Sequence, residues 1–397
     1  MESPVRRAEY GVTAVAGVLA LGVVSAAIGL FGYQQVDPWR SQLGPWPIPI
    51  SPSASTSPPA PIISSLPDPP RLGEPIALPS ALTAINASGP VVTPDQAGGI
   101  VRAWWPVHEQ ALAGNNMVAT DQLDSGGFQQ FSDGQTLDLV GRQLKWRTVR
   151  PLIDLRLFVP RQNTYPADFL AIVETAPYAT DQSQPSGTKV VEFVVFQRTA
   201  ASDSWKAALE SDAYTATWPP SVFPTVGGGS PYETAPQGPF AVAPLDLPGA
   251  LASYWTAAYQ SGTAPTGSPF ASATFVNLGG QSIYEDRLAW EKRTGLIGGA
   301  TYSVDAADPV FQFSVNGSSD AVCFTVRVLS NTKRAGGGTM HQDPARQNYG
   351  GRLPPGQYRA LISYGEHQAC TYDPPAGDGS PLVVEHVSGG DYREVPG

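Results

Sequence analysis

An uncharged apolar stretch near the start of the chain constrains its folding more than any other feature. Residues Gly11 to Phe31 carry no charge, and their most polar members are Thr13 and Ser25. Twenty-one helical residues extend about 31 Å, which matches the hydrocarbon core of a bilayer. The sequence therefore predicts a single transmembrane helix over 11–32.

The basic residues around this stretch predict its orientation. Arg6 and Arg7 precede it, and the next basic residue is Arg40. Because positive charge is retained on the cytoplasmic side, residues 1–10 are predicted to form a cytoplasmic tail. The localisation expected is a single-pass cell-membrane protein whose C-terminal region is extracellular and whose contact with the membrane is this one helix. A cleaved signal peptide is the alternative, but its apolar region is usually about 7–15 residues long, so we favour an uncleaved signal anchor.

Composition and charge exclude several classes of protein. The chain has 24 basic and 34 acidic residues, a net charge of −10, which argues against binding to nucleic acid. Hydrophobic residues make up 42% of the chain, which excludes a fully disordered protein. Its two cysteines are too few for a disulfide-rich scaffold or a four-cysteine zinc site.

Proline dominates the segment that follows the apolar stretch. Residues Gln34 to Pro94 include fifteen prolines. Proline lacks the amide donor that helices and sheets need, so we expect residues 33–92 to form an extended stalk.

Beyond the stalk, the sequence predicts a first folded module over 93–216. Thr93-Pro94-Asp95-Gln96 has the pattern of a capped helix start, and Pro106 is expected to kink or interrupt that helix. A second, weaker helical stretch is predicted near Thr136–Trp146. Alternating or continuous apolar residues then predict four strands of an antiparallel meander, at Leu152–Val159, Asp168–Ala176, Lys189–Gln197 and Trp205–Leu209.

A linker rich in proline and glycine, predicted over 217–244, separates this module from a second one over 245–397. Asp246-Leu247-Pro248 opens a helical pattern there. Five strand-like runs follow it, at Ala300–Val304, Val310–Val315, Val322–Leu329, Gln357–Tyr364 and Leu382–Val387.

The two modules share short sequence matches in the same order, which predicts a tandem repeat. The aromatic pair Trp104-Trp105 aligns with Tyr254-Trp255 in the opening helices. Helices followed by a curved meander, with this pair and with Ser204-Trp205-Lys206, resemble nuclear-transport-factor-2-like (cystatin-like) cone modules of exported actinobacterial proteins. The layout is also similar to conjugation-type transfer proteins of Gram-positive bacteria. The resemblance implies an α+β fold with two tandem cone-shaped modules, and it brings no functional residues with it.

The sequence has no strong motif of a catalytic site. The chain has no Gly-x-Ser-x-Gly nucleophile turn and no phosphate-binding loop. Asp154, Asp168 and Glu192 fall in predicted strands, where solvated carboxylates are a better interpretation than a general base. We therefore expect no enzyme activity, no catalytic residues and no cofactor.

Histidine and cysteine suggest one metal hypothesis, which we do not favour. Glu366-His367 and Glu385-His386 fall on predicted strands close to Cys370. Neighbouring residues of a strand point to opposite faces, so only part of this set can converge, and no metal site is predicted.

Cys323 and Cys370 are predicted to form a disulfide. Both fall near strands of the second module, and an extracytoplasmic location would let the bond persist. Alternation places Cys323 opposite Phe324, Val326 and Val328, on what the sequence indicates is the less apolar face of the sheet. Two unpaired core cysteines are the alternative.

A basic, glycine-rich loop is the candidate binding segment. Asn331 to Pro355 is predicted to replace a hairpin turn, and it has one acidic residue, Asp343. On an acidic protein it could bind an anionic wall polymer or an acidic envelope protein; the alternative is a solvated insertion. Its basic residues are Lys333, Arg334, Arg346 and Arg352.

These observations favour a non-catalytic function. The leading hypothesis is a membrane-anchored, extracytoplasmic binding or scaffold protein of the bacterial cell envelope, within a secretion or transfer assembly. The alternative is a small-molecule binder or an enzyme that uses the cavity of the first module. An open pocket with a buried carboxylate would favour the alternative, and an interior filled by Trp, Phe and Leu would favour the scaffold.

Overall fold

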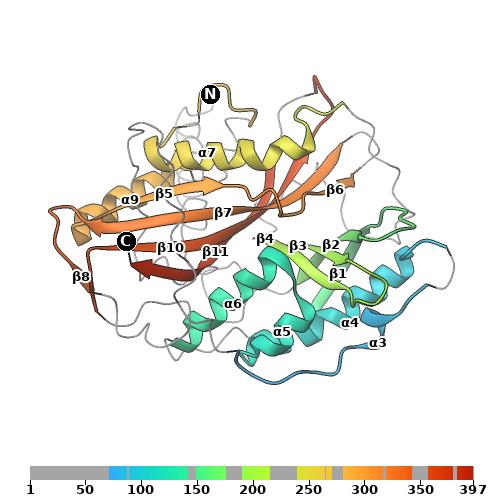
Figure 1. The fold of residues 1–397 in the computed structure, drawn as a ribbon. Helices are drawn as coiled ribbons and strands as arrows, with labels where there is room; N and C mark the ends of the chain where they lie inside the picture. The colour runs from blue at the N-terminus through green and yellow to red at the C-terminus, as the bar shows by residue number, and fades with distance from the viewer. Residues whose placement is uncertain are drawn as a thin grey trace, which may run out of the picture.

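The computed structural model describes residues 71–86, 89–141, 149–175, 190–214, 239–263, 265–270, 280–315, 319–341, 356–378 and 382–396. The predicted membrane span and most of the predicted stalk lie outside these ranges. Within them, no helix is both long and apolar enough to cross a membrane. The described part is an α+β protein with antiparallel sheets (Figure 1).

Four strands in chain order form the first sheet. Their order is β1-β2-β3-β4 and all three pairings are antiparallel, so the predicted meander is confirmed. The strand β4 continues beyond the predicted end at Leu209. The strands are β1 (Leu152–Phe158), β2 (Ala167–Thr175), β3 (Val190–Arg198) and β4 (Lys206–Tyr214).

The longest helix before this sheet, α4 (Pro94–Ala113), begins as its sequence predicts. Thr93 and Gln96 form a capping box in which each side chain accepts a hydrogen bond from the other's backbone amide. Of the two effects expected at Pro106, a kink or an interruption, the interruption is wrong, because α4 continues through this residue. Burial of one face of this helix offsets the lost backbone hydrogen bond.

Two further helices follow α4. The short helix α5 (Met117–Leu123) is absent from the sequence prediction; the Asn116 side chain caps it by accepting from the Ala119 amide at 3.0 Å. The helix α6 (Gly126–Gly141) begins earlier than the predicted stretch near Thr136. Together with the first sheet, α3–α6 make up what we call the first unit.

Residues that the sequence assigns to the end of the stalk pack on the first unit. Leu82, in the short helix α3 (Ser80–Thr83), is fully buried in the core, and Val92 is nearly so. We call residues 71–79 the strap. Gln122 of α5 holds the strap by accepting from the Ile76 amide at 2.8 Å.

A second sheet has the order β11-β10-β7-β5, and all its pairings are antiparallel. The strand β6 (Phe311–Ser314) pairs with the start of β7, on the same edge that β5 occupies farther along. The helices α7 (Leu247–Ser261) and α9 (Gly280–Thr294) precede this sheet, and together they form the second unit. Its long strands are β5 (Leu296–Ser303), β7 (Asp320–Arg334), β10 (Ala360–Asp373) and β11 (Leu382–Pro396).

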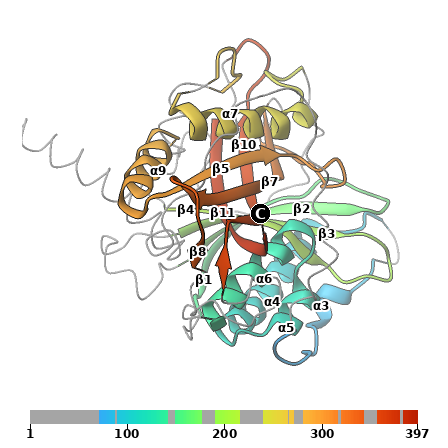
Figure 2. The ribbon, with the colours of Figure 1, turned by 60° about the vertical axis from the view of Figure 1, so that its left-hand side comes forward.

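The two sheets pack on each other, and helices cover their outer faces (Figures 1 and 2). Alternation along β3 explains the layers, because Phe193 faces the second sheet whereas Phe196 faces α4. In the second sheet, Phe313 and Cys323 belong to the core between the sheets, whereas Phe324 belongs to the core under α7. The described chain is thus layered as helices, sheet, sheet and helices.

The contact between units is close enough to need glycine at one point. A Cβ at Gly127, near the start of α6, would lie 2.7 Å from Glu366 Oε2 and from Thr325 Oγ1 in the second sheet. The Glu210 amide of β4 also donates to Gln368 Oε1 of β10 at 2.6 Å. The second unit therefore packs against both α6 and β4 of the first.

Candidate functional site

A disulfide joins Cys323 and Cys370, as the sequence predicts. The two residues are direct partners on β7 and β10, with a Cα–Cα distance of 4.0 Å. The expectation that the bond lies on a less apolar face is wrong. Both cysteines are fully buried in the core between the sheets, because the facing sheet covers that side too.

The predicted basic loop is only partly described. Lys333 and Arg334 lie at the end of β7, where they pair with residues of β5, so the strand extends into the range predicted as loop. Both side chains are exposed. Arg346 and Arg352 lie outside the described residues. The short strands β8 (Met340–His341) and β9 (Gln357–Tyr358) pair with each other beyond this point.

Aromatic side chains fill the space between α4 and the first sheet. Trp104 packs edge-on against Phe196, with ring centroids 5.1 Å apart, and Phe169 contacts both Phe196 and Trp205. Both indole N–H groups of α4 have acceptors, since Trp104 donates to a backbone carbonyl at 3.2 Å and Trp105 to another at 2.8 Å. The interior of this unit is therefore a packed core.

A buried charge cluster lies at one end of that core. Arg150 donates to Glu109 of α4 at 3.1 Å, to Thr175 of β2 at 3.3 Å and to Glu192 of β3. Burial alone would lower the pKa of Arg150, but the charges of Glu192 and Glu109 outweigh it and raise that pKa. The interpretation of Glu192 as a solvated strand carboxylate is wrong, because it is fully buried. This cluster ties together α4 and two strands.

The other two strand carboxylates have local partners. Asp154 accepts from the Leu155 amide at 2.8 Å. Asp168 accepts from the side chain of Gln162 at 3.2 Å. Burial raises the pKa of Asp168 to about 6, and the hydrogen bond from Gln162 opposes that rise.

A second buried polar pair, His108 and Asp124, escaped the sequence analysis. The two side chains are 3.1 Å apart, from Nε2 to Oδ2, and Ser132 Oγ lies 3.5 Å from the same carboxylate oxygen. The Trp104 ring stacks on the imidazole with centroids 4.1 Å apart. Burial raises the pKa of Asp124, whereas His108 opposes that rise. The Trp-x-x-x-His spacing on α4 is the one sequence signal that could have indicated this stack.

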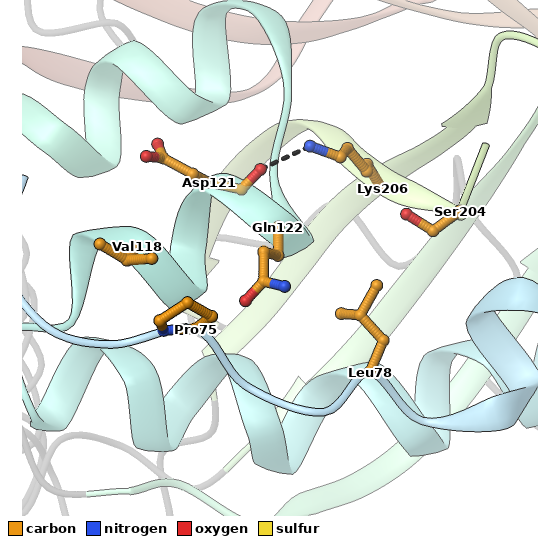
Figure 3. Close-up of a pocket in the computed structure, with 7 residues that line it drawn as sticks. All are labelled: Pro75, Leu78, Val118, Asp121, Gln122, Ser204 and Lys206. Atoms are coloured by element: carbon orange, nitrogen blue, oxygen red, sulfur yellow. Dashed lines mark hydrogen bonds between the residues drawn. The ribbon is translucent and has the colours of Figure 1, made fainter.

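A shallow pocket of about 420 Å³ lies between the strap, α5 and the start of β4 (Figure 3). The Lys206 ammonium reaches toward α5 and donates to the Asp121 carbonyl and, at 3.3 Å, to the Asp124 carbonyl. Gln122 is held by the strap backbone. The lining of the pocket therefore combines apolar side chains with one ammonium group. Its lining residues are Pro75, Leu78, Val118, Asp121, Gln122, Ser204 and Lys206.

The histidine–cysteine metal hypothesis does not fit the second sheet. His367 lies on the face under α7, with its ring centroid 5.3 Å from that of Trp255 and 5.3 Å from that of Tyr302. Cys370 lies on the opposite face and is in the disulfide. The register places His386 opposite Ala369. In the part of the chain that the structure describes, no group of three or more His, Cys, Asp or Glu residues could hold a metal ion.

Comparison with known proteins gives no match for this chain among family models, curated proteins or solved structures.

Proposed function

We propose that this chain is a non-catalytic binding or scaffold protein of the bacterial cell envelope, anchored by the helix predicted over 11–32. The observation that carries the proposal is the aromatic core between α4 and the first sheet. The place where a cone-shaped enzyme would hold its substrate is filled by Trp104, Phe169, Phe196 and Trp205. Arg150, buried at one end of that core, is engaged with two carboxylates and joins structural elements.

The proposal includes two tandem cone modules, supported by the order of the elements. In each unit the helices precede the sheet in the chain. The neighbouring strands then follow in chain order, β1-β2-β3-β4 in the first sheet and β5-β7-β10-β11 in the second. The corresponding residues Trp105 and Trp255 are both buried against a sheet, with 2% and 4% exposure. A tandem repeat would give the envelope protein two similar bodies on one stalk.

An extracytoplasmic location is supported by the Cys323–Cys370 disulfide, because such bonds persist in oxidising compartments. Protease added to intact cells or spheroplasts should digest residues 34–397 and leave a short membrane-protected fragment. A cytoplasmic marker protein, intact in the same sample, is the control. Full protection of the C-terminal region would contradict the proposed topology.

The binding surface we propose includes the exposed basic residues Lys333 and Arg334, together with Arg346 and Arg352, and its partner is an anionic wall polymer or an acidic envelope protein. A photo-crosslinking residue at position 333 should capture that partner in living cells. The same residue at Asp203, on the turn between β3 and β4, is the control. Capture that is equal at both positions, or that survives Arg334→Glu, would contradict this surface. A secretion or transfer assembly is the narrower hypothesis for the partner.

A small-molecule binder or enzyme is the second candidate, and the pocket at Lys206 is the observation that favours it. Its one ammonium group and its apolar wall of Pro75, Leu78 and Val118 would suit a small ligand with an acidic group. Binding of such ligands that Lys206→Met abolishes would support this candidate over the scaffold. Lys206→Arg, which keeps the charge, is the matched control.

A further inference from the structure

Two buried carboxylates face each other at one end of the second sheet. Asp320, at the start of β7, is the direct antiparallel partner of Asp373, at the end of β10. Direct partners project from the same face of a sheet with Cβ atoms about 4.5–5.5 Å apart. Both residues are fully buried. Like charges in this arrangement repel each other, so the pair needs a specific explanation.

Each carboxylate uses only one of its oxygens within the protein. Gln312 of β6 donates to Asp320 Oδ2, and the Val242 amide donates to Asp373 Oδ1 at 3.4 Å. Asp320 Oδ1 and Asp373 Oδ2 are buried and have no hydrogen-bond partner. Among the described residues, no basic side chain forms a salt bridge with either carboxylate.

A serine hydroxyl and the backbone before α7 lie beside the pair. The register places Ser314 of β6 opposite Asp320, and this serine is 4% exposed. The segment before α7 crosses the end of β10, where the Ala241 amide donates to the Pro374 carbonyl at 2.9 Å. Burial raises the pKa of Asp320 and of Asp373 to about 6, and the charge of Asp320 adds to the rise at Asp373. When ionised, the two side chains have no counter-charge within salt-bridge distance among the described residues.

We propose that Asp320 and Asp373 bind a divalent cation of the calcium class between β7 and β10. Asp320 Oδ1 and Asp373 Oδ2 would be its two anionic ligands, and the Gln312 side chain, which contacts Asp320, would be a neutral neighbour. Calcium takes oxygen ligands only and accepts flexible geometry, so two carboxylates supplemented by neutral oxygens and water suit it better than zinc. The cation would also fix the segment before α7 to the sheet through Asp373.

Calcium should stabilise the full-length protein, because a ligand that binds only the folded state raises its stability. The full chain in detergent, treated with EDTA and then dialysed, should show a rise in Tm of roughly 3 °C or more at a few millimolar CaCl2. Magnesium, which demands stricter octahedral geometry, should raise Tm less. NaCl at matched ionic strength controls for screening. Tryptophan fluorescence at pH 7.5 follows the transition.

Neutral variants of nearly the same shape test the two ligands. Asp320→Asn and Asp373→Asn should each remove the calcium-dependent rise, whereas Asp95→Asn, at an exposed acid of α4, should keep it. Because each variant removes one buried charge, its Tm without calcium should not fall below that of the wild type. This expectation separates loss of the site from loss of the fold.

Two results would overturn the proposal. One is a wild-type Tm that no divalent cation raises; a rise on acidification to pH 5 in that case would mean that the pair shares a proton. The other is a calcium-dependent rise that persists in both asparagine variants, which would place the cation elsewhere.

Discussion

The two units of the protein bury charged side chains in different ways. In the first unit, Arg150 lies between Glu109 and Glu192, so charges of both signs are buried together. In the second, Glu366 is fully buried beside Arg327, whose guanidinium is 3.6 Å away. That guanidinium also pairs with two aspartates, at 2.7 and 3.0 Å, so Glu366 receives only part of its charge.

This difference indicates which change, a substitution or a shift of pH, should alter the stability of each unit most. A buried ion cluster whose carboxylates share one guanidinium depends on that guanidinium, because removing it leaves two buried charges uncompensated. A buried carboxylate with partial compensation depends on pH instead, and burial raises the pKa of Glu366 to about 8 although Arg327 opposes the rise. The second unit adds a covalent link between β7 and β10, which the first unit lacks.

The largest effect should come from removing the guanidinium of Arg150 in the first unit. Arg150→Met leaves Glu109 and Glu192 buried without a counter-charge, so the free energy of unfolding should fall by about 3–5 kcal/mol. Urea unfolding followed by tryptophan fluorescence measures this change. The triple variant Arg150→Met/Glu109→Gln/Glu192→Gln is the control and should recover most of the loss. No recovery would mean that the loss reflects packing around Arg150, and the contrast between the units would then fail.

Next in size is the disulfide of the second unit. The double variant Cys323→Ala/Cys370→Ala should lower the free energy of unfolding by about 2–4 kcal/mol, because the unfolded chain loses a constraint between residues 47 positions apart. A reducing agent should destabilise the wild type by a similar amount and leave the variant unchanged. Two free thiols in the non-reduced, denatured wild type would contradict the bond and weaken the case for export.

A third effect should depend on pH. The folded-state pKa of Glu366 is raised, so the folded state holds its proton more tightly and stability increases as pH falls through about 8 toward the usual range of a glutamate. Glu366→Gln should therefore stabilise the protein by on the order of 1–3 kcal/mol at pH 9 and change little at pH 5. Thermal unfolding at both pH values checks this. An equal effect at both would show that ionisation of Glu366 is not the cause.

The sequence predicted local structure well, because the signals for a helix start or a strand lie within a few consecutive residues. The capping box of Thr93 and the alternation along the strands are such signals. Six of the seven residues from Val190 to Phe196 in β3 are apolar, which is typical of a strand buried on both faces, yet we did not infer sheet-on-sheet packing from them. The predicted start of the loop at Asn331 is wrong because β7 continues to Arg334 and has pairing partners on both edges, which the residues themselves do not reveal.

The contacts between buried charged groups that are distant in the chain could not have been predicted. Arg150 and Glu109 are 41 residues apart in the chain, and only the packing of α4 on the first sheet brings them together. Asp320 and Asp373 face each other because of the register between β7 and β10, where a shift of one residue would turn them to opposite faces. Register and packing depend on the whole fold, so residue types alone gave these side chains no distinguishing signal.

The smallest effect compares the helices that open the two units. Thr93 Oγ1 accepts from the Gln96 amide at 3.3 Å, and Gln96 Oε1 accepts from the Thr93 amide at 2.9 Å. At the start of α7, the Asp246 side chain makes no capping hydrogen bond.

Thr93→Ala should therefore lower the free energy of unfolding by about 1 kcal/mol, whereas Asp246→Ala should change it by only a few tenths. Urea unfolding of both variants under the same conditions measures the difference. A Thr93→Ala/Gln96→Ala double variant should lose less than the sum of the single changes, because the two side chains form one reciprocal unit. A cap without a hydrogen bond can act only through its charge near the first amides, so its removal should have the smaller effect. If Asp246→Ala lowered the free energy of unfolding as much as Thr93→Ala, the expected difference between the two helix starts would be wrong.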